Sequence, residues 1–156
     1  MKNKFGIAGL IALIFVASIF LAVRSVVTLV SSFSGETERV RVGDDIFSVR
    51  VSDTESEREK GLSGSAPLEK NEGMLFVYDS PVIPTFWMKD MKFPIDIIWI
   101  SKGRVVGWVT DLDPQRGASD SELRRYLPGQ PIDSALEVPS GTVLDLDITL
   151  GDLVSR

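Results

Sequence analysis

The sequence predicts a mainly β domain, a jelly-roll-like sandwich or a small closed barrel with one short helix, preceded by a single N-terminal transmembrane helix. Three observations support this class: short apolar segments, turn residues at short intervals, and one long apolar run near the N-terminus. A chain of 156 residues suits one domain. We divide it into a cytoplasmic N-terminus (1–4), a signal-anchor helix (5–30), a linker (31–37) and an extracytoplasmic β domain (38–154).

The N-terminal apolar run is long enough to cross a membrane. Residues 5–23 carry no charge, and about 20 apolar residues in a helix span a hydrocarbon core of about 30 Å. The run extends toward residue 30 if Arg24 reaches the interface. Lys2 and Lys4 precede it, which by the positive-inside rule places the N-terminus in the cytoplasm and the domain outside the cell membrane. The alternative is a cleaved signal peptide, whose apolar core is usually about 7–15 residues long.

Apolar patterns predict the strands. Residues 39–52 alternate around Gly43-Asp44, which predicts a hairpin with one wet face. Residues 74–78 are apolar throughout, as in a strand covered on both faces. In 142–150 the leucines and Ile148 share one face and two aspartates the other. The further strands are predicted at 86–89, 95–100, 104–110, 134–138 and 142–150.

One helix and one long loop complete the prediction. Thr54 and Glu57 fit a capping box, and Gly61 is a plausible C-terminal stop for a short helix. Residues 111–133 show no strand pattern, although three prolines frame a possible helical turn with Ser119 as its cap. A loop of this length is often functional, for example as a lid, and the alternative is an ordinary solvated excursion.

The composition excludes several classes of site. The chain has no histidine and no cysteine, which removes disulfides, thiolate nucleophiles, Ser-His triads and the ligands that zinc and haem prefer. Asp111 and Asp113 lack the spacing of a calcium loop, so neither a metal nor a cofactor is expected. Of 17 basic and 22 acidic groups, residues 1–35 hold three basic ones only. The remainder therefore carries −8, and nucleic acid is not an expected partner.

The sequence contains a series of short motifs in a fixed order. They are Glu57-Arg58-Glu59-Lys60-Gly61-Leu62, Gly73-Met74-Leu75-Phe76, Phe86-Trp87-Met88-Lys89, Pro94-Ile95-Asp96-Ile97-Ile98, Ala135-Leu136-Glu137-Val138 with Gly141, and Gly151-Asp152. These motifs resemble the domain-of-unknown-function family number 192 over residues from about 46 to 154. This sequence departs from the family pattern at Asp90-Met91, usually Asn-Thr, and at Ser63, often Met. The resemblance implies a compact jelly-roll-like β fold and no established activity.

Asp96 is a carboxylate inside the apolar strand predicted at 95–100. A buried carboxylate either takes up a proton or finds a partner. We expect a cation as that partner, first Arg58, because its planar guanidinium holds a carboxylate bidentately, and otherwise Lys89 or Arg104. An Asp96–Arg58 pair would tie the short helix to the sheet.

A second carboxylate, Glu137, lies in the apolar strand at 134–138. Two carboxylates whose pKa values are pushed apart meet the requirement for hydrolysis of a glycosidic bond, so Asp96 and Glu137 are the catalytic candidates. Trp87 offers a stacking face for a sugar, or else packs in the core, and Lys89 offers a contact for an anion. The candidate binding residues are Arg58, Trp87, Lys89, Asp96, Tyr126 and Glu137.

The function expected from these observations is binding rather than catalysis. We expect a membrane-anchored extracytoplasmic module that holds a small ligand, a glycan or a protein partner at the cell envelope, and contacts the membrane through 5–30. Two alternatives stay open. One is a carboxylate-based hydrolase or lyase that acts on an envelope glycan, and the other is a structural scaffold whose buried charges clamp the fold.

Overall fold

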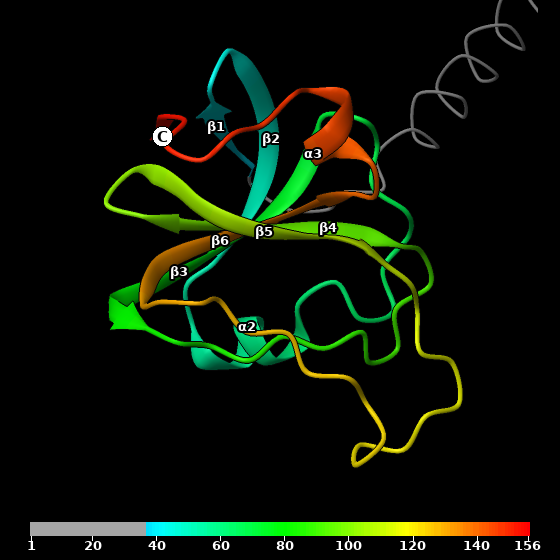
Figure 1. The fold of residues 1–156 in the computed structure, drawn as a ribbon. Helices are drawn as coiled ribbons and strands as arrows, with labels where there is room; N and C mark the ends of the chain where they lie inside the picture. The colour runs from blue at the N-terminus through cyan, green and yellow to red at the C-terminus, as the bar shows by residue number, and fades with distance from the viewer. Residues whose placement is uncertain (1–36) are drawn as a thin grey trace, which may run out of the picture. The chain divides into compact units, whose positions relative to one another are not determined.

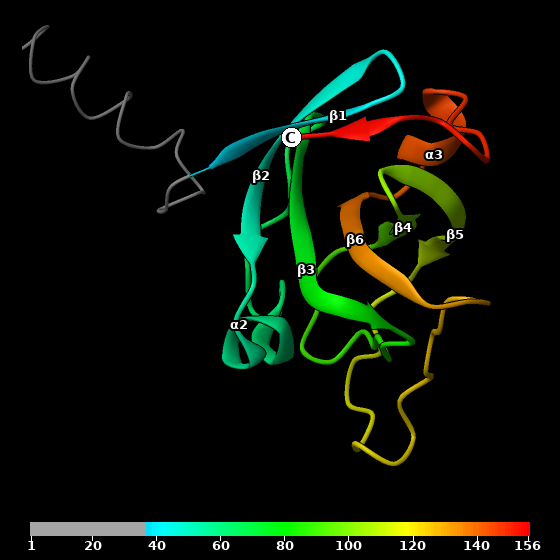
Figure 2. The ribbon, with the colours of Figure 1, turned by 90° about the vertical axis from the view of Figure 1, so that its left-hand side faces the viewer.

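The computed structural model describes residues 37–156, which lie within one compact unit. In this part of the chain one curled sheet has the strand order β5-β4-β6-β3-β2-β1-β7 (Figures 1 and 2). The mainly β class is confirmed, but the described chain has two short helices where one was predicted. The elements are β1 (Glu38–Val42), β2 (Asp45–Ser52), α2 (Glu55–Lys60), β3 (Glu72–Val82), β4 (Ile95–Ser101), β5 (Arg104–Leu112), β6 (Ile132–Pro139), α3 (Thr142–Asp145) and β7 (Val154–Ser155).

The predicted hairpin and the predicted helix are both confirmed. β1 and β2 pair in antiparallel fashion around Gly43-Asp44, with Val40 opposite Phe47 and both side chains buried. The chain then crosses through α2 to β3, which pairs with β2 in parallel. At the start of α2 the Thr54 amide donates to Glu57 Oε2 (3.1 Å) and the Glu57 amide donates to Thr54 Oγ1 (3.3 Å). This reciprocal capping fixes where the helix begins.

The central strands β3, β4 and β6 separate two apolar clusters. The helix-side cluster, next to α2, contains Met74, Phe76, Ile97, Trp99 and Ala135 together with Leu62 and Phe86. The hairpin-side cluster, next to the β1–β2 hairpin and α3, contains Leu75, Ile98, Leu136 and Val138 together with Val40, Phe47 and Val143. Because neighbouring residues of a strand point to opposite faces, consecutive residues of these strands belong to different clusters.

The substitution Gly73→Ala is expected to destabilise the sheet. A Cβ at Gly73 in β3 would lie 2.8 Å from the Glu137 carbonyl oxygen and 3.1 Å from Leu136 Cδ1. The carbonyl belongs to the paired strand β6, so relief requires the two strands to separate. We expect a loss of about 1–3 kcal/mol in the free energy of unfolding, measured by urea titration. Gly129→Ala is the control, since nothing lies within 4 Å of its added Cβ; equal midpoints for both variants would contradict the prediction.

The strand predicted at 142–150 is wrong. Gly141 has a φ of 87° and turns the chain into α3, and the predicted apolar face is broken because Leu144 and Leu150 are 79% and 66% exposed. Val143 and Ile148 are the side chains of this stretch that join the hairpin-side cluster. The alternation in the sequence therefore comes from a short helix and a turn, not from a pleated strand.

The strand predicted at 86–89 is also wrong, because only Phe86 forms a backbone bridge, to Tyr126. β3 instead continues to Val82, four residues beyond the end of the strand predicted at 74–78. The long loop is confirmed for 113–131, where the bridge at Tyr126 is isolated. Ser119 caps only a turn, in which its amide donates to Glu122 Oε2 (2.9 Å).

The C-terminal residues connect the two ends of the strand order. The Val154 amide donates to the Gly103 carbonyl (2.8 Å) and the Val105 amide to the Asp152 carbonyl (3.0 Å), while β7 pairs with β1. Among residues 37–156, no helix has the length and apolarity that a membrane crossing needs. The predicted cytoplasmic segment, anchor and most of the linker lie outside the described residues.

Candidate functional site

The two candidate catalytic carboxylates lie on opposite faces of the sheet. In the antiparallel pairing of β4 with β6, Asp96 is opposite Val138 and Ile97 is opposite Glu137. Directly paired residues share a face, so Asp96 points to the hairpin-side cluster and Glu137 to the helix-side cluster. The two carboxyl groups therefore do not meet in one pocket, and the paired geometry expected for glycosidic hydrolysis is not present.

Asp96 is held by backbone amides and not by a cation. Its side chain is fully buried. Oδ1 accepts from the Asp111 amide and Oδ2 from the Val143 amide, each at 3.0 Å. No ion pair to Asp96 occurs within 37–156, so the expected pairing with Arg58, Lys89 or Arg104 is wrong. The carboxylate instead fastens the end of β5 and the start of α3 to β4.

Arg58 joins α2 to the sheet, but through a carbonyl group. Its Nη1 donates to the Val77 carbonyl in β3 (2.9 Å) and to the Asp53 carbonyl. The guanidinium carbon lies 5.2 Å from the centroid of the Tyr78 ring, a cation–π arrangement. The predicted link between helix and sheet is thus present, with a partner other than Asp96.

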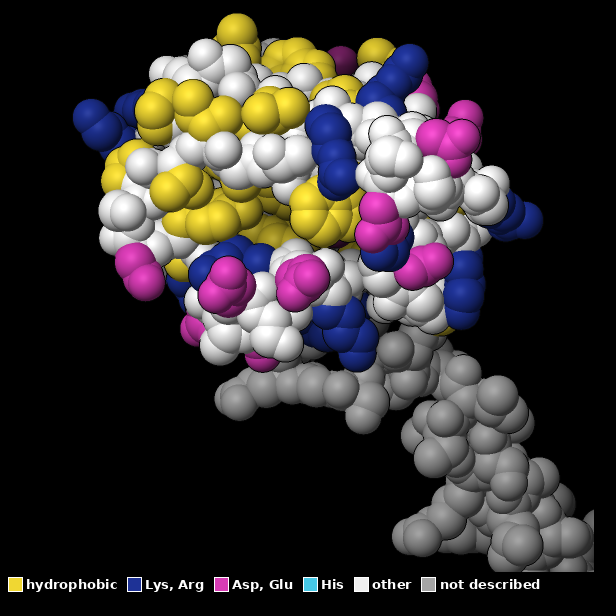
Figure 3. Space-filling view, turned by 90° about the horizontal axis from the view of Figure 1, so that it is seen from below, with side chains coloured by type: hydrophobic (Ala, Val, Ile, Leu, Met, Phe, Trp, Pro, Cys, Tyr) yellow, Lys and Arg dark blue, Asp and Glu magenta, His cyan; other side chains and the backbone are white. Residues whose placement is uncertain are grey.

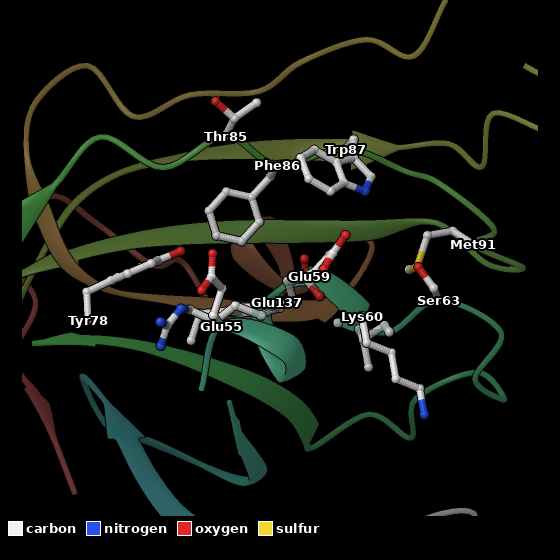
Figure 4. Close-up of a pocket in the computed structure, with 14 residues that line it drawn as sticks. Glu55, Glu59, Lys60, Ser63, Tyr78, Thr85, Phe86, Trp87, Met91 and Glu137 are labelled. Atoms are coloured by element: carbon white, nitrogen blue, oxygen red, sulfur yellow. The ribbon is translucent and has the colours of Figure 1, made fainter. Parts of the chain in front are cut away.

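A pocket of about 370 Å³ lies between α2 and residues 85–87, over the helix-side face of β3 and β6. Figure 3 shows a hollow with hydrophobic side chains inside it and acidic and basic ones along its margin. Figure 4 shows Phe86 and Trp87 on one side of this space and Tyr78, Glu55 and Glu137 on the other. Its lining is Leu62, Phe76, Phe86, Trp87, Met91 and Gly61, with the polar residues Glu55, Arg58, Glu59, Lys60, Ser63, Tyr78, Thr85 and Glu137.

Glu137 is the unusual group of this pocket. Its side chain is 6% exposed, and its Oε2 has no hydrogen-bond partner among the described residues. Burial raises the pKa of Glu137 to about 8, because a desolvated site disfavours the charged form. Near pH 7 the carboxyl is therefore mostly protonated, and a protonated carboxyl can donate a hydrogen bond.

Tyr78 lies beside Glu137 in the same pocket. Burial raises the pKa of its phenol to about 12; the nearby Arg58 works against that increase and the nearby Glu137 adds to it. The Tyr78 hydroxyl makes no hydrogen bond to any residue of 37–156. The pocket lining thus includes two O–H groups, on neighbouring strands, that make no hydrogen bond to another described residue.

The other predicted site residues lie outside this pocket, except Trp87. The Trp87 ring lines the pocket and has the Arg125 guanidinium carbon 4.8 Å from its centroid. Lys89 forms an exposed ion pair with Asp120 (2.7 Å). Tyr126 exchanges two backbone hydrogen bonds with Phe86, and its side chain packs against the helix-side cluster. The pocket therefore brings together Arg58, Trp87 and Glu137, but not Lys89, Asp96 or Tyr126.

Tyr78, Phe86 and Ser63 also line the pocket, although the sequence did not predict them as site residues. A signal existed for Tyr78, since it follows Met74 and Phe76 at two-residue spacing and places a polar group at the end of an apolar strand. For a metal, the described residues contain no cluster of three or more suitable side chains. The pocket therefore offers hydrogen-bonding groups together with an aromatic packing surface.

Fold and pocket together define residues 37–156 as a small curled β domain with an aromatic-walled cavity. The chain belongs to the DUF192 family, described as "Uncharacterized ACR", whose model matches residues 38–156. That match confirms the resemblance and extends it slightly at both ends.

Two solved structures share the fold. A protein of unknown function from Novosphingobium aromaticivorans DSM 12444 is 24% identical, with a TM-score of 0.70 over 81% of this chain and 96% of its own. A putative transcription regulator from Sinorhizobium meliloti 1021 is 25% identical, with a TM-score of 0.69 over 79% of this chain and 95% of its own. A comparison with curated proteins found no significant match.

Proposed function

We propose that this protein is a membrane-anchored binding module of the cell envelope, which holds a small ligand in the pocket between α2 and residues 85–87. The observation that carries the proposal is the buried Glu137 oxygen without a hydrogen-bond partner. A polar group buried without a partner costs free energy. A ligand in the pocket, which Glu137 lines, supplies to this carboxyl group a partner that no residue of 37–156 provides.

The size and lining of the pocket support the same proposal. Small-molecule sites commonly enclose about 300–1,000 Å³ and combine apolar walls with a few placed polar groups. This pocket has about 370 Å³, an aromatic wall that includes Phe86 and Trp87, and polar groups from Arg58, Tyr78 and Glu137. The alternative function, a structural scaffold, is supported at Asp96, because both of its carboxylate oxygens accept hydrogen bonds from backbone amides.

Two parts of the proposal concern the rest of the chain. Residues 5–30 anchor the module with its N-terminus in the cytoplasm, supported by the uncharged run and the preceding lysines. We also propose that the sheet closes as a small barrel, supported by the hydrogen bonds between 103–105 and 151–154. Protease added to intact cells tests the orientation, because a fully protected domain would contradict it.

A fragment screen followed by NMR tests the binding function. We expect bound fragments to shift amide signals around the pocket and the indole signal of Trp87. The variant Trp87→Ala is expected to weaken the fragments that bind by about tenfold, because buried tryptophan contacts commonly dominate binding. Its melting temperature should stay close to that of the unchanged protein.

Two variants serve as controls for this screen. Trp108 is another partly exposed tryptophan and lines a different cavity, so Trp108→Ala should leave fragment binding unchanged. Lys89→Ala should do the same, since Lys89 pairs with Asp120 outside the pocket. A screen in which no fragment maps to the pocket, or in which Trp108→Ala and Trp87→Ala act alike, would overturn the proposed function.

A further inference from the structure

We infer that the pocket takes a ligand with an aromatic or otherwise apolar body and a hydrogen-bond acceptor oxygen, a carbonyl or a carboxylate, which sits between the side chains of Glu137 and Tyr78. This inference rests on the proposed function and names the class of ligand for the same site. Beyond the proposed function, it specifies which group of the ligand contacts Glu137 and Tyr78 and which chemical group the site disfavours.

The two side chains reach the same space from neighbouring strands. Met74 in β3 is paired with Glu137 in β6, and Tyr78 lies four residues after Met74, so that all three share the helix-side face. Figure 4 shows Tyr78 and Glu137 on the same side of the pocket, with Phe86 across from them. Neither the Tyr78 hydroxyl nor Glu137 Oε2 forms a hydrogen bond with another described residue, so one guest atom between the two side chains can satisfy both.

The protonation of the two groups makes them donors. Burial raises the pKa of Glu137 to about 8 and that of Tyr78 to about 12, so both carry a proton near pH 7. Two O–H groups that line one pocket from neighbouring strands favour an acceptor oxygen between them. An ammonium group at that point would meet no ionised carboxylate and would leave both donors unsatisfied.

Arg58 strengthens this preference. Its guanidinium group lies over the Tyr78 ring and lines the pocket, so it adds positive potential on the side of the two hydroxyl groups. Taken together, the charged groups of the lining balance, with Arg58 and Lys60 against Glu55 and Glu59. The lining therefore selects only weakly for the net charge of the ligand, so both a neutral carbonyl compound and a carboxylate can bind.

The opposite wall selects an aromatic body. The Phe86 ring of this wall meets the Phe76 ring from β3 edge to face, with the centroids 5.2 Å apart, and Trp87 and Met91 also line the pocket. Aromatic rings pack favourably against such edges and faces, and methionine sulfur contacts rings favourably as well. A flat bicyclic ring with one oxygen substituent fits these requirements.

The inference is tested by NMR titration of the folded protein with three naphthalenes of matched shape. They are 2-acetylnaphthalene, 2-naphthoate and 2-(aminomethyl)naphthalene. At about pH 6.5 we expect the ketone or the carboxylate to bind about tenfold more tightly than the amine. The variant Tyr78→Phe should weaken the ketone about fivefold, the usual effect of one lost hydrogen bond. Tyr126→Phe, which removes a hydroxyl outside the pocket, should change nothing.

The pH dependence provides a second readout. Raising the pH to about 9 ionises Glu137 and is expected to weaken ketone binding about fivefold or more. In Glu137→Gln the amide group still donates, so this variant should bind the ketone equally at both pH values. A merely structural role for Glu137 would not produce this difference between the two proteins.

Several outcomes overturn the inference and leave the proposed function intact. One is that the amine binds most tightly, and another is that neither Tyr78→Phe nor a change of pH alters ketone binding. A third is that screened fragments occupy the pocket when no naphthalene binds. If neither screened fragments nor naphthalenes occupy the pocket, the proposed function falls as well.

Discussion

Replacing Asp96 with alanine is expected to lower the free energy of unfolding by ~3–5 kcal/mol. The carboxylate accepts hydrogen bonds from the Asp111 and Val143 amides, both at 3.0 Å, and is fully buried. Bonds to a charged group contribute about 1.5–3 kcal/mol each, and truncation leaves two amides with no acceptor. The loss should appear in the urea midpoint, together with faster amide hydrogen exchange at the start of α3.

A matched variant separates this effect from the loss of any acidic group. Asp113 is exposed and its side chain bonds to no described residue, so Asp113→Ala should change the free energy of unfolding by less than about 0.5 kcal/mol. Asp96→Asn gives an intermediate result, because its amide nitrogen would face one of the two N–H donors. If Asp96→Ala unfolds at the same urea concentration as Asp113→Ala, the structural role assigned to Asp96 is wrong.

Glu137→Gln is expected to remove most of a fall in stability between about pH 4.5 and pH 8. Burial raises the pKa of Glu137 from 4.5 to about 8. Between those values the folded state binds more protons than the unfolded state, so the free energy of unfolding decreases as the pH rises. By linkage the decrease due to this group is at most on the order of 5 kcal/mol.

The measurement is urea unfolding of both proteins at about pH 4.5 and about pH 9. Glutamine does not titrate, so the stability of the variant relative to the unchanged protein should increase over this interval. Glu69→Gln, at an exposed position, is the control and should follow the unchanged protein. A constant difference between Glu137→Gln and the unchanged protein at all pH values would show that Glu137 is ionised when folded.

Local signals in the sequence were sufficient for the parts of the fold that depend on a few adjacent residues. The Gly43-Asp44 hairpin and the Thr54 cap are of this kind, because a turn and a capping box are both made within four residues. The burial of the strand at 74–78 was also predictable, because all of its residues are apolar. The burial of Asp96 and Glu137 was predictable because each lies within a strand of apolar residues.

The face on which each carboxylate lies was not predictable. β4 and β6 are covered on both sides, so their sequences show no alternation that would distinguish one face from the other. The register, with Ile97 opposite Glu137, separates Asp96 from the pocket by a single position. The partners of Asp96 were also hidden, because every residue except proline carries a backbone amide and the sequence does not show which amides converge.

The pocket was predicted only in part for a similar reason. Arg58, Trp87 and Glu137 come from three separate segments, and each has an unusual side chain for its surroundings. Phe86 and Ser63 have ordinary ones, so only the position of residues 85–87 across the pocket from α2 shows that they line a cavity. The short helix α3 was missed because its four residues follow a left-handed glycine, and the alternating leucines gave a competing strand signal.

The ion pair between the last residue and the first strand has a consequence for the chain's connectivity. Arg156 donates to Glu38 Oε2 from Nε (3.0 Å) and Nη2 (2.8 Å). A few added residues would therefore bridge positions 156 and 38, and new ends could be opened in the exposed turn near Gly117. Such a circular permutant would keep every strand beside its present neighbours while moving the ends to the loop after β5.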